Sequence, residues 1–308
     1  MKTLVLSIVA ASALASSALA ADLKPVLKAK PVAPPPAWWE IAYGGALMSD
    51  YTFRGIPQSD RGMAGTFYFE GRLNPIPDVL QLYAGAQAWT TKLPTTPVGE
   101  FDLYGGMRVT TGPLQFDLGA LYYYYPRETQ VFLDPLTAGL GNVLIPGAIP
   151  FTKADTDFLE FYGKATWTVN PMLALGAYVY YTRNWLNTGA PGTYYGGTAK
   201  FTAPTTWFPA DWGAYVSGEF AHYNLGTTDA FFGFIDLPDY NYWNAGFGIT
   251  FKVFTLDFRY HDTNLDRTQC FVLTGDLHGL PGGGGPVARS NWCSRAFIVK
   301  ASVDTSAK

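Results

Sequence analysis

The sequence is poor in charged residues and has no long apolar run beyond its N-terminal segment. Charged side chains make up 15% of the 308 residues, whereas a soluble domain carries about 25%. A membrane-spanning helix needs about 18 or more consecutive apolar residues, and no such run occurs after the N-terminus. Transmembrane helices are therefore excluded, and the low charge favours a protein whose outer surface meets lipid. The formal net charge of −3 gives no indication of nucleic-acid binding.

Histidine is also scarce, which bears on catalysis. The chain has 3 histidines, His222, His261 and His278, and a serine nucleophile needs a base such as histidine beside it. His261 is followed by Asp262, but consecutive residues of a strand face opposite sides. No serine nucleophile motif and no phosphate-binding glycine loop accompany these residues. The sequence therefore predicts no enzyme, no cofactor and no metal site, and an outer-membrane hydrolase is the least favoured alternative.

The N-terminus has the features of a secretory signal peptide at residues 1–20. Lys2 precedes an apolar run at 4–14, and small residues then lead to a predicted cleavage site after Ala20. A membrane anchor is the alternative, but the run is too short for a hydrocarbon core of about 30 Å. The proline- and lysine-rich residues 21–38 are predicted to form an extended periplasmic leader. A contact of this leader with peptidoglycan or a partner is the less favoured interpretation.

The rest of the chain alternates apolar and polar side chains with a period of two. Between residues 40 and 54, Ile41 and Leu47 occupy odd positions, and Asp50 and Arg54 occupy even ones. This pattern predicts an extended strand with one apolar and one polar face. It recurs in about 12 segments, within a range of roughly 10 to 14, at residues 40–54, 63–73, 80–88, 100–109, 114–122, 158–169, 173–181, 193–203, 213–223, 240–253, 255–262 and 295–303.

The connections between these segments alternate in length. Those after even-numbered strands are short, such as 74–78 and 111–113, and those after odd-numbered strands are long, such as 127–154 and 263–294. Short periplasmic turns and long extracellular loops are typical of outer-membrane barrels, and a closed barrel leaves no unpaired strand edge in lipid. We therefore predict an all-β fold, a closed antiparallel transmembrane β-barrel formed by residues 39–308. Candidates for its aromatic girdles are Trp38, Trp39, Trp89, Trp167, Trp212 and the run Tyr122–Tyr125.

Several motifs carry a resemblance to a known family. The stretch Ser49–Asp60 (SDYTFRGIPQSD) closely resembles the opening signature of the proteobacterial Gcw_chp family, whose members are also described as TorF-type porins. Weaker similarities occur at Glu100–Gly106, Tyr122–Pro126 and Asp257–Thr263. The resemblance implies an outer-membrane barrel with a channel role, and it supplies no substrate and no active site.

The chain also departs from the family pattern. Its loops at 127–154 and 263–294 are longer, and its last residues, 303–308, lack the terminal aromatic residue of many outer-membrane barrels. Phe297 is therefore expected near the middle of the final strand, whose exact end the sequence does not define.

Inward-facing charged residues are the candidates for the channel mouth and lumen. If Asp50 and Arg54 share the inner face of the first strand, they lie roughly 13 Å apart. One hypothesis makes them a filter that selects solutes by charge. The favoured alternative is a latch, in which Arg54 pairs with a loop carboxylate and fixes the loop. The full candidate set is Asp50, Arg54, Glu70, Arg72, Glu100, Asp102, Arg108, Glu160, Lys164, Asp257 and Arg259.

Two further features concern the loops. Residues 127–154 are the candidate for a plug of the lumen, with an ordinary surface loop as an equal alternative. Cys270 and Cys293 bracket the last long loop, and we predict a disulfide between them, worth about 3 kcal/mol in the chain-entropy model. The alternative is a metal site that includes His278. Paired cysteines agree with an oxidising compartment.

Together these features predict an outer-membrane channel for passive diffusion of small hydrophilic solutes or ions. The alternative is a structural or surface-recognition barrel whose lumen is plugged and whose extracellular loops bind a partner. Expected partners are outer-membrane lipid, small solutes or ions, and the barrel-assembly machinery during biogenesis. The sequence leaves open the solute, the ion selectivity, the open or plugged state of the lumen and whether the protein forms a homo-oligomer.

Overall fold

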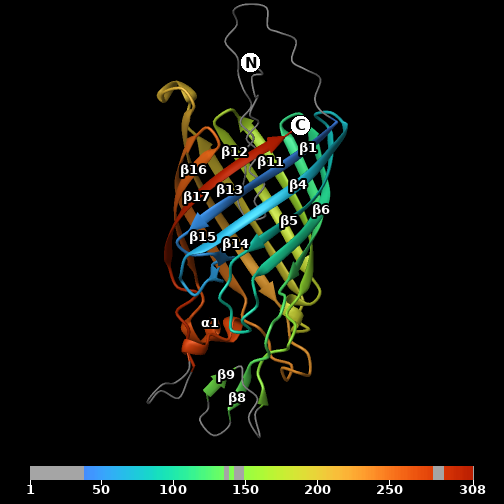
Figure 1. The fold of residues 1–308 in the computed structure, drawn as a ribbon, viewed down its shortest axis with the longest axis vertical. Coiled ribbons are helices and arrows are strands. Elements are labelled where there is room, and N and C mark those ends of the chain that lie inside the picture. The colour runs from blue at the N-terminus through green and yellow to red at the C-terminus, as the bar shows by residue number, and fades with distance from the viewer. Residues whose placement is uncertain (1–37, 135–138, 142–148, 280–287, 308) are drawn as a thin grey trace, which may run out of the picture.

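A computed structural model describes residues 38–134, 139–141, 149–279 and 288–307. The predicted signal peptide, its cleavage site at Ala20 and all of the predicted leader except Trp38 lie outside these residues. Twelve antiparallel strands form a closed barrel (Figure 1). They are β1 (Trp39–Met48), β4 (Ala64–Ile76), β5 (Leu80–Trp89), β6 (Glu100–Thr111), β7 (Leu114–Tyr124), β11 (Phe158–Asn170), β12 (Leu173–Thr182), β13 (Gly192–Thr202), β14 (Trp212–Leu225), β15 (Tyr240–Phe251), β16 (Phe254–Thr263) and β17 (Ala296–Ala307).

The barrel closes between its first and last strands. β1 pairs with β4 along one edge, where Ala42 lies opposite Glu70, and with β17 along the other, where Ala42 lies opposite Ser306. Each strand from β4 to β16 in the barrel pairs with the barrel strands that precede and follow it in the chain, and β17 pairs with β16 and β1. No barrel strand therefore keeps a free edge, and the predicted fold and strand number are confirmed.

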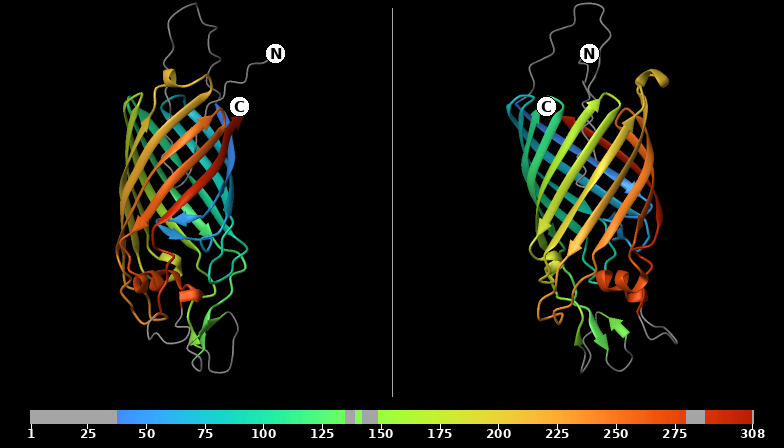
Figure 2. Two further views of the ribbon diagram at one scale, coloured as in Figure 1. Left: turned by 90° about the vertical axis from the view of Figure 1, so that its left-hand side faces the viewer. Right: turned by 180° about the vertical axis from the view of Figure 1, so that it is seen from behind.

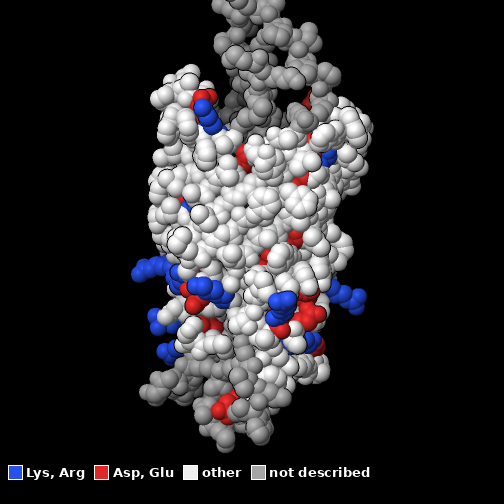
Figure 3. Space-filling view, viewed as in Figure 1, with Lys and Arg blue, Asp and Glu red and all other residues white. Residues whose placement is uncertain are grey.

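The strands carry the two faces that the alternation predicts. Along β4, Phe67 and Phe69 point outward and are 57% and 51% exposed, while Tyr68 and Glu70 point inward and are buried. The outer wall is largely free of charged side chains, whereas Lys and Arg gather near one end of the barrel (Figure 3). An apolar outside and a polar inside are the reverse of a soluble barrel and are typical of one that spans a membrane.

The two ends of the barrel differ. Short turns occupy one end. Among the described residues of these turns, the only helical segment is the 3₁₀ turn η2 (Thr205–Trp207). The long loops project from the other end (Figure 2). They contain β8 (Phe132–Asp134), β9 (Gly139–Gly141), β10 (Ile149–Pro150), η1 (Trp185–Asn187), α1 (Arg267–Thr274) and η3 (Leu277–Gly279). No helix in the described part of the chain is long and apolar enough to cross a membrane.

The first predicted strand, 40–54, was too long. β1 ends at Met48, and the chain then turns into a short hairpin formed by β2 (Thr52–Phe53) and β3 (Ile56–Pro57). Arg54 and Gly55 have φ angles of 51° and 85°, which an extended strand does not allow. Asp50 and Arg54 therefore belong to this hairpin and not to the wall.

Three assignments of aromatic residues were also wrong. Phe297 is the second residue of β17 and not its middle. In the run 122–125, Tyr122 and Tyr124 are exposed on the outside, but Tyr123 and Tyr125 are buried. Trp89 stacks on Tyr51 of the hairpin, with ring centroids 4.1 Å apart, and does not belong to a girdle.

Candidate functional site: the lumen and its hairpin

The lumen holds every charged residue that the sequence placed there. Eight of the eleven candidates are buried, and Arg108, Lys164 and Arg259 are partly buried. They do not gather into one site. The wall residues form separate ion-pair networks, and Asp50 and Arg54 come from the hairpin that lies between them.

One network follows the wall at β1, β4 and β6. Arg72 Nε donates to Glu70 Oε1 at 2.5 Å, and its Nη1 donates to Glu40 Oε1 at 3.0 Å. Arg108 adds two bonds to the same Glu70 carboxylate, at 2.8 and 3.0 Å. Because the side chain of Glu70 has no exposed surface, these two arginines satisfy a charge that water does not reach.

A second network occupies the wall at β14, β15 and β16. Arg259 makes two bonds to Asp257, at 2.9 and 3.1 Å, and donates to Asn244 Oδ1 at 2.7 Å. Its Nη2 also donates to Ser217 Oγ at 2.8 Å. The guanidinium is thereby bonded to residues of three neighbouring strands, and it also lines a cavity.

The hairpin between β1 and β4 is built from local hydrogen bonds. The backbone N–H of Gln58 donates to the carbonyl of Tyr51 at 2.6 Å, and Ser59 Oγ donates to Asp50 Oδ1 at 2.8 Å. Burial raises the pKa of Asp50 above its ordinary value, while the Ser59 hydrogen bond and the positive charge of Arg61 oppose that rise. We call residues 50–62 the lumen hairpin.

Arg54, at the tip of the lumen hairpin, reaches across the barrel. Its Nη1 and Nη2 donate to the two carboxylate oxygens of Glu160 on β11, at 2.9 and 2.6 Å. Both side chains are fully shielded from solvent. The guanidinium also lies over the rings of Tyr194 on β13 and Tyr223 on β14, 4.3 and 4.7 Å from their centroids.

The position of these partners shows that the lumen hairpin spans the lumen. In a ring of twelve strands, β12 is the one farthest from β1, and β11, β13 and β14 are its near neighbours. The hairpin leaves the wall at β1, so a contact of Arg54 with β11, β13 and β14 requires a crossing of the barrel interior. Loop 127–154 was the candidate for the plug. Its described residues lie beyond the strand ends instead (Figure 1).

The other flank of the lumen hairpin contacts β5 and β6. Tyr51 stacks on Trp89, and its hydroxyl donates to Glu100 Oε1 at 2.5 Å. Tyr125 donates to the second oxygen of Glu100 at 2.8 Å, and Trp89 Nε1 donates to Asp102 Oδ2 at 3.0 Å. Glu100 and Asp102 thus act as acceptors that hold aromatic side chains against the hairpin.

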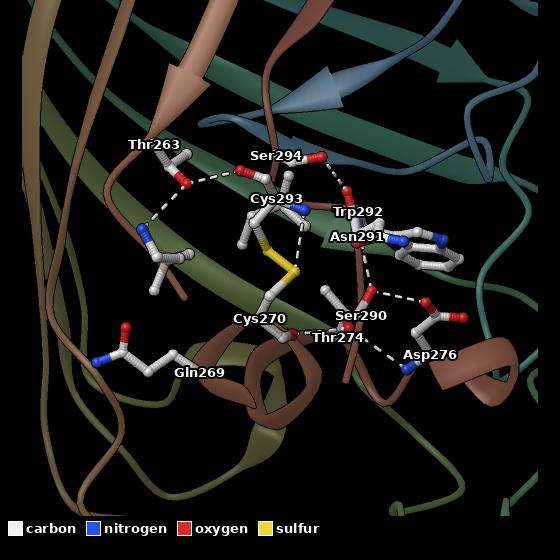
Figure 4. The surroundings of a disulfide bond; sticks show 12 residues. Thr263, Gln269, Cys270, Thr274, Asp276, Ser290, Asn291, Trp292, Cys293 and Ser294 are labelled. Atoms are coloured by element: carbon white, nitrogen blue, oxygen red, sulfur yellow. Dashed lines mark hydrogen bonds between the residues drawn. A yellow bond between two sulfur atoms is a disulfide. The ribbon is translucent and has the colours of Figure 1, made fainter. Parts of the chain in front are cut away.

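The last long loop contacts the lumen hairpin through residues next to its disulfide, whose surroundings Figure 4 shows. Cys270 on α1 and Cys293 form a disulfide, as predicted, with their Cα atoms 5.7 Å apart, so the alternative metal site with His278 is excluded. Trp292 Nε1 donates to Asp60 at 3.1 Å. Arg61 Nη2 donates to the carbonyls of Asn291 and Ser294 at 2.6 and 2.7 Å, so that residues next to the disulfide are fastened to the hairpin.

A cavity of about 140 Å³ lies beneath the lumen hairpin. Tyr51 and Arg54 of the hairpin line it, together with wall residues that include Asn244, Arg259 and Lys300. This volume holds several water molecules, and its lining offers hydrogen-bonding groups and charges of both signs, the acidic ones being Asp50, Glu219 and Asp257. The interior is therefore polar and incompletely filled on this side of the barrel.

Gly55 is a position where the lumen hairpin touches the wall closely. Its φ is +85°, and a Cβ there would lie 2.7 Å from Cδ2 of Tyr242 and would also collide with Thr263. We expect Gly55→Ala to lower the stability of the refolded protein by about 1–3 kcal/mol, measured as a fall in its thermal midpoint. Gly233→Ala is the matched control, because Gly233 has a φ of +78° with no atom near a Cβ. Equal losses in both variants would contradict the close packing of the hairpin.

The sequence did not reveal how many tyrosines face the lumen. The hydroxyls of Tyr83 and Tyr162 form a hydrogen bond of 2.5 Å. The hydroxyls of Tyr178 and Tyr194 both donate to Glu219. The signal was present in the alternation, because Tyr162 lies between the inward-facing Glu160 and Lys164. Aromatic residues were assigned to the lipid face by type, although a tyrosine hydroxyl suits a polar interior.

One group of carboxylates outside the lumen has metal-like spacing. Ligand atoms of Glu128, Asp155 and Asp157 lie within 4.8 Å of one another. Thr95 and Thr156 already donate to Glu128, at 2.6 and 2.7 Å. Burial raises the pKa of Glu128, and the hydrogen bonds from both threonines oppose the rise. Hydrogen bonds within the loops account for this cluster without a bound ion.

The fold and the lumen define the class of the protein: a transmembrane β-barrel whose interior is crossed by a hairpin from its first long loop. The sequence profile of the Gcw_chp family, described as a bacterial protein of unknown function, matches residues 32–143. The matched segment contains the motifs Ser49–Asp60 and Glu100–Gly106 that carried the resemblance. No curated protein sequence matches the chain.

Solved structures similar to this chain are outer-membrane barrels. An outer membrane channel from Pseudomonas putida F1 is 10% identical with a TM-score of 0.43, and 91% of this chain and 100% of that chain are covered. LpxR from Salmonella typhimurium is 9% identical with a TM-score of 0.39, with coverages of 86% and 99%. OmpT, an outer membrane protein of Vibrio cholerae, is 9% identical with a TM-score of 0.37, with coverages of 86% and 96%. At these values the similarities carry no argument about function.

Proposed function

We propose that the protein is an outer-membrane channel for small hydrophilic solutes or ions, constricted by its lumen hairpin. The observation that carries this proposal is the crossing of the barrel by Arg54 above a polar cavity. A polar interior suits the passage of hydrophilic solutes, and the hairpin limits the cross-section through which they pass. The long loops and the disulfide would face the outside, and the short turns the periplasm.

We propose further that the protein has no catalytic activity. In the described part of the chain, His222 Nδ1 pairs with Asn241 Oδ1 at 2.8 Å, and His261 Nδ1 pairs with the hydroxyl of Tyr242 at 2.7 Å. Neither histidine is thereby aligned with a serine and a carboxylate as hydrolysis requires. His278 Nδ1 lies 3.5 Å from Asp276 Oδ1, but the hydroxyl of Ser290 donates to Asp276 and not to His278. A lipid-hydrolysis assay tests this proposal, and release of fatty acid would contradict it.

A second candidate function is a plugged barrel that acts through its extracellular loops. The complete burial of Arg54 and Glu160 favours it, because a wide and open pore would wet both side chains. The two candidates share the same hairpin and differ in whether solutes pass it.

Conductance in planar bilayers separates the two candidates. The refolded full chain is expected to give small current steps, and replacement of residues 52–57 by two glycines is expected to enlarge them several-fold, because the hairpin no longer crosses the lumen. Replacement of residues 230–235 by two glycines is the control, since this segment belongs to an outer loop. Silence of the full chain would contradict the channel and favour the plugged barrel, and current steps from the shortened-hairpin variant alone would identify the lumen hairpin as the plug.

A further inference from the structure

Three basic side chains lie together where the outer wall meets the loops. Arg61 precedes β4, Lys92 follows β5 and Arg295 immediately precedes β17, and all three are exposed. Arg61 Nη1 donates to the carbonyl of Arg295 at 3.3 Å, and a Cβ on Gly62 would lie 3.2 Å from Lys92 Nζ. We call these three residues the basic rim. They flank four adjacent strands, β17, β1, β4 and β5.

The wall beside the basic rim is strongly apolar. Its exposed side chains at the loop end of the same strands are Leu47 (64%), Met63 (76%), Phe67 (57%) and Phe297 (63%). Phe297 lies on the lipid-facing side of β17, and Arg295, which precedes the strand, is exposed as well. The face that carries these strands shows blue side chains where the uncharged wall ends (Figure 3). The basic rim therefore lies at the level where acyl chains give way to headgroups.

Nearby carboxylates form no ion pair with the basic rim in the described part of the chain. Asp60 instead accepts a hydrogen bond from Trp292, and Asp262 accepts from the hydroxyl of Tyr260 at 2.7 Å. Among the ion pairs formed by the described residues, none includes a member of the basic rim. Arg61 donates hydrogen bonds to backbone carbonyls, and because these groups are uncharged, its positive charge is not neutralised. Lys92 and Arg295 keep their charged groups available to a ligand.

We propose that the basic rim binds the phosphate groups of lipopolysaccharide in the outer leaflet, with the acyl chains against the apolar wall below. Exposed, uncompensated arginine and lysine side chains attract anionic headgroups and donate charge-assisted hydrogen bonds to phosphate. Among the described residues of the short-turn end, the exposed basic residue is Lys252 in the β15–β16 turn, and it stands alone there. The basic rim would thus fix the depth and rotation of the barrel in an asymmetric membrane. This inference does not depend on whether the lumen conducts.

Binding of fluorescent lipopolysaccharide to the full-length protein in detergent tests the proposal. The double variant Lys92→Gln/Arg295→Gln is expected to bind about thirtyfold more weakly, since each basic side chain near an anionic surface contributes about fivefold. Arg61 is left in place because it holds the last loop. The matched control, Lys252→Gln/Arg267→Gln, removes the same charge from the short-turn end and from α1, which lies beyond the strand ends (Figure 1), and is expected to bind like the unmodified chain.

Dephosphorylated lipopolysaccharide provides the second arm of the experiment. It is expected to bind both double variants and the unmodified chain equally weakly. Equal affinity of the two double variants for the phosphorylated form would overturn the proposal, as would undiminished binding after dephosphorylation, which would indicate apolar contact alone. If the rim double variant fails to refold, Lys92→Gln and Arg295→Gln are measured singly, each with about a fivefold loss expected.

Discussion

Replacement of Arg54 by alanine is expected to raise the single-channel conductance of the refolded protein several-fold. The substitution removes the ion pair with Glu160 and the ring contacts that carry the lumen hairpin across the barrel. It also leaves the Glu160 carboxylate buried without a positive charge beside it, since its remaining partner is the hydroxyl of Tyr123, at a cost of about 3–5 kcal/mol. The hairpin is therefore expected to leave its position, and planar-bilayer recordings in a salt gradient would report both conductance and ion preference.

Ion preference separates the latch from the filter. A latch predicts a large rise in conductance, whereas a charge filter predicts a changed ion preference at nearly unchanged conductance. Arg108→Ala is the control, since Arg108 also pairs with a buried carboxylate but belongs to the wall. The double variant Arg54→Ala/Glu160→Ala is expected to recover stability, because no charge remains unpaired, while it keeps the high conductance. Unchanged conductance in Arg54→Ala would show that the pair does not hold the hairpin.

Loss of the disulfide is expected to have the second large effect. The bond joins residues 23 positions apart, and its removal by Cys270→Ser/Cys293→Ser should lower stability by about 3 kcal/mol in the chain-entropy model. The loop end should also open more often, because Trp292 and Asn291 beside Cys293 hold the lumen hairpin through Asp60 and Arg61. Limited trypsin digestion, followed at Arg289 and Arg295, should be faster, and the thermal midpoint should fall.

A reductant provides the control for this prediction. It should change the unmodified chain in the same direction and leave the double serine variant unaffected. Two reactive thiols in the unreduced protein would contradict the disulfide itself.

The wall of the barrel could be predicted from the sequence because its signal is local. A strand with lipid on one side and water on the other must alternate, and each alternating segment identifies itself without knowledge of its partners. The predicted segment 114–122 and β7 begin at the same residue, and the predicted segment 173–181 differs from β12 by one residue. The prediction from the period of two was wrong after Met48. Asp50 and Arg54 continue the alternating pattern in the sequence, but the chain leaves the barrel wall at this point.

The contacts in the lumen could not be predicted because they join distant parts of the chain. Arg54 and Glu160 are 106 residues apart, and alternation shows that both point inward but not that they meet. The latch hypothesis named the role of Arg54 and assigned its partner to a loop, whereas Glu160 belongs to β11. Loop 127–154 was the candidate for a plug because of its length and composition, with an ordinary surface loop as an equal alternative, whereas the hairpin that crosses the lumen follows the first strand.

The order of the chain gives the lumen hairpin a place in assembly. It is made before any of the strands that hold it, since β11, β13 and β14 all come later in the sequence. Arg54 at its tip therefore has no partners until more than half of the wall exists. After that, β17 must still pair with β1, the strand from which the hairpin starts. The hairpin can be enclosed during that last pairing or threaded inward afterwards. Either route makes the seating of Arg54 a late step in the maturation of the barrel.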